Sequence, residues 1–152
     1  MREIAEMTGG VTLAIALAVP AAAQPVGPAQ SATASAIARV QHIDPSIHAV
    51  IALDPTAMAQ AQRVDASGRR GPLAGQPVLL KDNIEAAGPL PTTAGSLALT
   101  RNVTNRDAPL VARLRGAGAV ILGKTNLSEW ANIRSSHSIS GWSAVGGQTH
   151  NP

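Results

Sequence analysis

The sequence of 152 residues contains no cysteine, no phenylalanine and no tyrosine, and its only aromatic side chains besides histidine are Trp130 and Trp142. The lack of cysteine excludes disulfides, thiolate zinc sites and thiol nucleophiles from these residues. With so few aromatic residues, a core must be built from Ala, Val, Leu and Ile, which bury little area each. Charged residues are also scarce at 14%, but 45% of the residues are hydrophobic, which excludes a disordered tail. The sequence therefore predicts one folded domain or part of one.

Positive charge exceeds negative charge by only three, and its distribution excludes a nucleic-acid-binding surface. The arginines are scattered along the chain, with one adjacent pair at Arg69 and Arg70, and no aromatic residues lie between them to stack on bases. Ten of the twelve basic residues are arginines. The two lysines, Lys81 and Lys124, both follow short apolar runs, so the search for chemistry starts with them.

The first 23 residues have the pattern of a secretory signal peptide. A nine-residue apolar stretch, Val11–Val19, precedes Pro20 and an alanine-rich cleavage site that ends at Ala23. Cleavage there predicts export to the periplasm or the medium, and the stretch is too short to anchor the chain in a membrane, which takes about 20 apolar residues. Glu3 and Glu6 offset Arg2, so the alternative is a disordered N-terminus on a cytoplasmic protein.

The remaining residues predict a short linker followed by an α/β fold. Residues 24–35 are rich in Pro, Ala and Ser and are predicted to be a linker, so the domain spans 36–152. Strand and helix patterns then alternate, with continuous apolar strands, which is typical of a mixed, largely parallel sheet covered by helices. The predicted helices are 36–43, 56–66, 108–115 and one beginning near Leu127 with a capping box of Asn126 and Glu129, and the predicted strands are 47–53, 77–80 and 119–122.

Residues 118–125 match the phosphate-loop pattern G-x-x-x-x-G-K-[ST], but the context is wrong for that function. A phosphate loop follows a strand, whereas here the residues between Gly118 and Gly123 are themselves a predicted strand. The four histidines lack metal-ligand spacing, so no metal or other cofactor is predicted. Ser143 does not fit the nucleophile elbow G-x-S-x-G.

Lys81 is the stronger candidate for chemistry. A lysine at the end of a buried strand is poorly hydrated, and desolvation favours the neutral amine that can accept a proton from a serine hydroxyl. Strand alternation places Asp82 on the opposite face, where it cannot hold Lys81 in its charged form. The alternative from position alone is a lysine that extends from the strand end to water.

The chain contains six further segments of interest: 75–84 (GQPVLLKDNI), 92–96 (TTAGS), 117–126 (AGAVILGKTN), 128–132 (SEWAN), 138–143 (SISGWS) and 147–152 (GQTHNP). In this order and spacing they resemble the amidase signature family, whose members hydrolyse amides with a Ser–Ser–Lys relay. The last three are most similar to the peptide amidase branch, which removes the C-terminal amide of peptides. The resemblance begins at about Ala36 and implies the N-terminal part of an amidase fold.

The resemblance implies a role for three residues. Lys81 corresponds to the catalytic lysine, the base that deprotonates a bridging serine, which in turn activates the nucleophilic serine. Lys124 does not correspond to a catalytic position. Ser136 and Ser138 lie in a segment that borders the family's substrate pocket and are candidates for substrate contact. The two serines of the relay come after the position of Pro152, so the 152 residues alone are expected to be inactive and to need no cofactor.

Two other functions remain open at this point. One is the amidase-like subunit of a tRNA-dependent amidotransferase, which passes ammonia to a partner subunit. The other is a truncated product without catalytic function. The predicted signal peptide and the tryptophan-containing segments favour an exported enzyme that acts on a small-molecule or peptide amide. The oligomeric state and the side-chain preference of the substrate are not encoded in any of these patterns.

Overall fold

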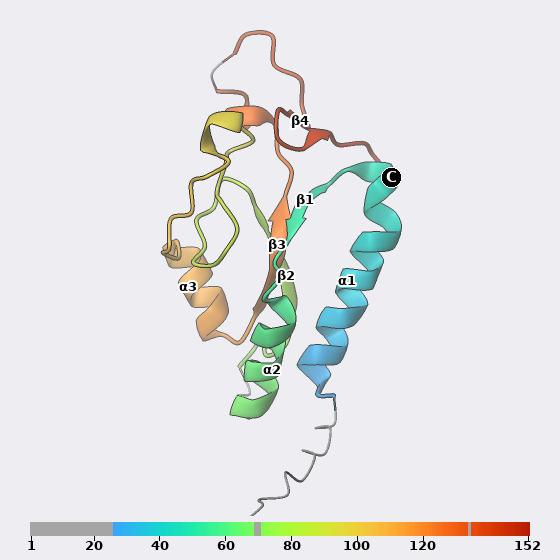
Figure 1. Ribbon diagram of the computed structural model, residues 1–152, viewed down its shortest axis with the longest axis vertical. Coiled ribbons are helices and arrows are strands. Elements are labelled where there is room, and N and C mark those ends of the chain that lie inside the picture. The colour runs from blue at the N-terminus through green and yellow to red at the C-terminus, as the bar shows by residue number, and fades with distance from the viewer. Residues whose placement is uncertain (1–25, 69–70, 134) are drawn as a thin grey trace, which may run out of the picture.

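A computed structural model of the chain describes residues 26–68, 71–133 and 135–152 and confirms the α/β class. The predicted signal peptide at 1–23 lies outside the described residues. The main elements are α1 (Pro28–Ile47), β1 (Val50–Leu53), α2 (Ala57–Ser67), β2 (Pro77–Lys81), α3 (Pro109–Gly116) and β3 (Val120–Thr125). Two 3₁₀ turns, Leu97–Leu99 and Glu129–Asn132, and a small hairpin of β4 (Trp142–Ser143) and β5 (Gly147–Gln148) complete the described fold (Figure 1).

The first helix contradicts the predicted linker at 24–35, because α1 begins at Pro28 and includes the rest of that segment. Alanine is the strongest helix former, so the composition that indicated a linker also suits a helix. The start of α1 is held by Asp65 of α2, whose carboxylate accepts the backbone N–H groups of Ala29 and Gln30 at 2.9 and 3.0 Å. The helix also continues past the predicted end and contains Pro45.

The three long strands form one sheet in the order β1–β3–β2. β3 pairs in parallel with β2 and antiparallel with β1, so the described sheet is mixed. Helices cover both faces: α1 and α2 lie on one side of the sheet and α3 on the other (Figure 1). Val120 and Leu122 pack against Ala61 and its neighbours in α1 and α2, whereas Ile121 packs with Val111 of α3.

A register irregularity in β3 decides where Lys124 points. Val78 pairs with Ile121, but the next residue of β2, Leu79, pairs with Gly123. The extra residue reverses the alternation, as in a β-bulge. Lys124 therefore faces the α3 side of the sheet together with Ile121 and is buried there.

The predicted capping box at Asn126 and Glu129 does not form. The turn at 129–132 begins at Ser128 without a side-chain cap. Asn126 instead accepts the hydroxyl of Ser143 at 2.7 Å, and Glu129 accepts the backbone N–H of Ala144 at 3.0 Å. Both side chains thus tie the end of β3 to the hairpin that follows it.

Candidate active site

Lys81 is the last residue of β2, and its side chain is exposed to solvent. The prediction that the amine of Lys81 is poorly hydrated is therefore wrong for the described part of the chain. The reason is that Lys81 is the last residue of β2 and belongs to neither hydrophobic cluster of the described fold. The alternation argument is confirmed, because the next residue, Asp82, is only 1% exposed and points into the fold. Lys81 is thus accessible on one side, and the nearest carboxylate along the chain is turned away from it.

The desolvated lysine is Lys124, which is 2% exposed. Its Nζ donates to the carbonyl oxygen of Ile84 at 2.7 Å and to Oγ1 of Thr92 at 2.9 Å, and lies 3.6 Å from Oδ1 of Asp82. Burial lowers the pKa of Lys124, while the carboxylate of Asp82 opposes that shift. An ammonium bound this closely by groups of its own fold is not free to bind phosphate, which agrees with the rejection of a phosphate loop.

Asp82 connects Lys81 to the loop at 92–96. The Asp82 carboxylate accepts the hydroxyl and the backbone N–H of Thr93, and the Asp82 carbonyl oxygen accepts the N–H of Ala94 at 2.9 Å. The loop continues this chain of bonds, since the carbonyl oxygen of Ala94 accepts the N–H of Trp130 at 2.9 Å. The strand end that presents Lys81 is therefore held rigidly against the 128–133 segment.

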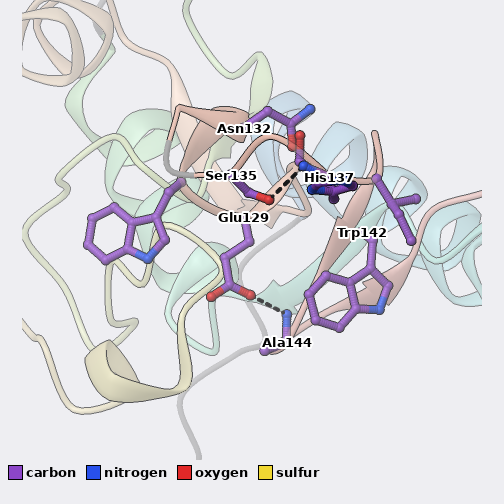
Figure 2. A pocket seen from close by; sticks show the side chains of 9 residues that line it. Glu129, Asn132, Ser135, His137, Trp142 and Ala144 are labelled. Atoms are coloured by element: carbon purple, nitrogen blue, oxygen red, sulfur yellow. Dashed lines mark hydrogen bonds between the residues drawn. The ribbon is translucent and has the colours of Figure 1, made fainter.

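That segment forms one wall of a cavity of about 530 Å³. The side chains around it include Glu129, Trp130, His137, Ser138 and Trp142 (Figure 2). Of the two serines predicted to contact substrate, Ser138 lines the cavity and Ser136 does not. The Oγ atom of Ser136 lies 3.0 Å from Nδ1 of His137. Substrate contact by either serine stays a prediction.

The sequence patterns did not predict the buried pair of Lys124 and Asp82 or the hydrogen bond between Glu129 and Ala144. The signal for Lys124 is present, because it lies two residues after Leu122 at the end of the most apolar run of the described chain. The predicted strand ends at Leu122, however, which leaves Lys124 in a loop. No local pattern points to Thr92 and Thr93, which meet Asp82 and Lys124 only through the fold.

Within the described ranges, no group of three or more His, Asp or Glu side chains could hold a metal ion. In the same residues no helix has both the length and the apolar character needed to cross a bilayer.

The fold and the sequence match those of known proteins. The sequence model of the Amidase family matches residues 31–152. An Arabidopsis thaliana protein named a probable amidase is 48% identical over 119 residues, which make up 74% of this chain and 23% of that protein. One subunit of the glutamyl-tRNA(Gln) amidotransferase of Acidothermus cellulolyticus is 42% identical over 123 residues, covering 78% of this chain and 24% of that relative.

Among solved structures, the native peptide amidase of Stenotrophomonas maltophilia superposes with a TM-score of 0.77 at 55% sequence identity, covering 82% of this chain and 26% of the enzyme. An amidase family protein of Bacillus anthracis superposes with a TM-score of 0.75 at 35% identity, again over 82% of this chain and 26% of that protein. The chain belongs to the Amidase family, and it spans about a quarter of the length of these relatives.

Proposed function

We propose that this segment belongs to an amide hydrolase that releases ammonia from a carboxylic amide or from the C-terminal amide of a peptide, with Lys81 as the base. The observation that carries the proposal is the 55% identity to the peptide amidase over a segment in which Lys81 ends β2 with an accessible side chain. Accessibility matters because the amine has to meet a serine that lies outside these residues.

In this proposal the neutral amine of Lys81 accepts the hydroxyl proton of the bridging serine, and that serine accepts the proton of the nucleophilic serine. The nucleophile attacks the amide carbonyl carbon, ammonia leaves with the transferred proton, and water hydrolyses the acyl-enzyme. The inward orientation of Asp82 supports the role of Lys81, because a carboxylate beside the amine would hold it protonated. The part of the enzyme that supplies the serines would also cover Lys81 and lower its hydration.

The test begins with the coding DNA downstream of Pro152 and uses the product of the complete open reading frame. Ammonia release from peptide amides is measured in a coupled assay. Lys81→Ala is expected to lower kcat/KM about a thousandfold, since a general base contributes that order of rate, and circular dichroism checks that the variant is folded. Arg113→Ala, which removes another exposed cation, is expected to keep full activity.

Full activity in a folded Lys81→Ala variant would refute the assignment of the base. A frame that stops at Pro152 and gives no ammonia would refute the hydrolase and favour a non-catalytic product. Lys124→Ala, compared on folded protein, is expected to keep far more activity than Lys81→Ala.

The second candidate is the amidase-like subunit of a tRNA-dependent amidotransferase, favoured by the 42% identity to the relative from Acidothermus cellulolyticus. The two functions differ in location and in the fate of ammonia. An exported protein, with a mature N-terminus at Gln24, cannot serve a cytoplasmic tRNA reaction. A full-length, cytoplasmic N-terminus together with glutamine-dependent transfer in the presence of a partner subunit would favour the amidotransferase instead.

A further inference from the structure

The only two tryptophans of the chain line the same cavity and leave much of their surface open. Trp130 is 40% exposed and Trp142 is 43% exposed. The core is built from Ala, Val, Leu and Ile, so neither indole is used for packing the interior. Trp130 also adopts a left-handed backbone conformation with φ of 49°, followed by Ala131 at 52°. Such strain tends to occur at ligand-binding segments.

A half-buried carboxylate lies between the elements that carry the two indoles. Glu129 precedes Trp130 in the chain, and its Oε2 accepts the backbone N–H of Ala144, two residues after Trp142. Figure 2 shows the Glu129 carboxylate and the Trp142 indole on either side of Ala144. Its other oxygen, Oε1, accepts no hydrogen bond from any residue that the structure describes. Glu129 is also the only acidic side chain among the described residues that line the cavity.

We propose that this cavity binds a cationic group, an ammonium or a guanidinium, of the amide substrate, and that Glu129 and the two tryptophans together set a preference for cationic amides. An aromatic face attracts a cation within about 6 Å of its centre, and a free carboxylate oxygen adds a charge-assisted hydrogen bond. A purely apolar ligand would leave Oε1 of Glu129 desolvated and unpaired, which is unfavourable. The inference rests on the proposed function, since it names the substrate class of the same site.

The cavity is connected through one loop to the strand end that carries Lys81. Trp130 is joined to Asp82, the residue after Lys81, by two successive backbone hydrogen bonds through Ala94, each of 2.9 Å. The hairpin that carries Trp142 is joined to the same loop, since the N–H of Val145 donates to the carbonyl oxygen of Gly95 at 3.1 Å. Both walls of the cavity are therefore hydrogen-bonded to the loop that also holds the end of β2.

The experiment compares three amides of similar size that differ in charge, using the product of the complete reading frame at pH 7, where the α-ammonium and the lysine side chain of a substrate are both mostly charged. Nα-acetyl-lysinamide carries a side-chain cation, norleucinamide carries only an α-ammonium, and Nα-acetyl-norleucinamide carries neither. We expect kcat/KM to be about tenfold higher for one or both cationic substrates than for the neutral one. The two cationic arms identify which ammonium the cavity binds.

Two variants test the residues. Glu129→Gln keeps an oxygen for the N–H of Ala144 but loses the charge, and it is expected to remove most of the preference. Trp142→Leu keeps an apolar wall but loses the π face, and it is expected to reduce the preference about threefold. The matched control is Glu85→Gln, which removes the same unit of charge outside the cavity, where Arg106 holds the carboxylate at 2.7 and 2.9 Å. This control is expected to keep the preference.

Binding is measured separately by calorimetry on the Lys81→Ala background, where turnover does not interfere. Equal rates and equal affinities for the three amides, with ammonia still released, would overturn this inference and leave the hydrolase standing. Tighter binding of the cationic amides that Glu129→Gln abolishes, without ammonia release in the wild type, would support the cation site and refute the hydrolase. A preference that survives in Glu129→Gln would overturn the role of Glu129.

Discussion

Replacing Lys124 with methionine keeps most of the side-chain volume but removes the charge that faces Asp82. Nζ and Oδ1 lie 3.6 Å apart, and both side chains are almost fully buried. Two unit charges at that distance attract each other by about 5 kcal/mol at an effective dielectric constant of 20. Methionine also cannot donate the hydrogen bonds that Nζ makes to Ile84 and Thr92, and removing one member of a buried, hydrogen-bonded pair costs about 3–5 kcal/mol. We therefore expect Lys124→Met to lower the free energy of unfolding by about 3–5 kcal/mol.

The assay is urea denaturation followed by far-UV circular dichroism at pH 7, with Asp82→Asn added to complete a double-mutant cycle. Asparagine keeps an oxygen for the donors of Thr93, so the double variant is expected to recover to within about 2 kcal/mol of the wild type. Lys81→Met serves as the control, because an exposed lysine with no described partner should change stability by less than about 0.5 kcal/mol.

Two results would refute this reasoning. A loss below about 1 kcal/mol in Lys124→Met would mean that the site is more hydrated than its 2% exposure indicates. Additive losses in the cycle would mean that Lys124 and Asp82 act independently, although Nζ and Oδ1 lie only 3.6 Å apart.

Two further predictions concern the same strand. Gly123→Ala is expected to destabilise the fold by at least about 2 kcal/mol in thermal denaturation, because a Cβ there would lie 2.2 Å from the carbonyl oxygen of Ala52. The control is Gly116→Ala, which should be neutral or slightly stabilising because no atom lies within 4 Å of its new Cβ. The second prediction concerns pH: because the folded-state pKa of Lys124 is lowered from 10.5, the unfolded chain binds more protons in the window below that value. The free energy of unfolding should therefore rise as the pH approaches 10.5 in the wild type, and this rise should be smaller in Lys124→Met; equal slopes would contradict the prediction.

Much of the element order could be predicted from local patterns. The apolar run before Lys81 predicts β2, and the helix predicted at 56–66 is α2, shifted by one residue at each end. These predictions hold because the residues that decide them are neighbours in the chain. The opposite faces of Lys81 and Asp82 follow in the same way from the period of a strand.

What could not be predicted depends on contacts between distant residues. The start of α1 depends on Asp65, which lies more than one element away. The burial of Lys124 depends on the register irregularity at Gly123, which no local pattern announces. The exposure of Lys81 depends on which segments pack over the end of β2, and none of the described residues buries it.

The position of β3 in the middle of the sheet has a consequence for how the chain folds during synthesis. β1 and β2 each pair only with β3 among the described strands, although both emerge from the ribosome earlier. Until residues 120–125 have been made, neither earlier strand has its sheet partner, and the apolar faces of α1 and α2 lack part of their cover. Pairing strands that are distant in the sequence slows folding and leaves hydrophobic surface exposed in the meantime. The nascent chain should therefore expose these apolar faces to chaperones until β3 has been made.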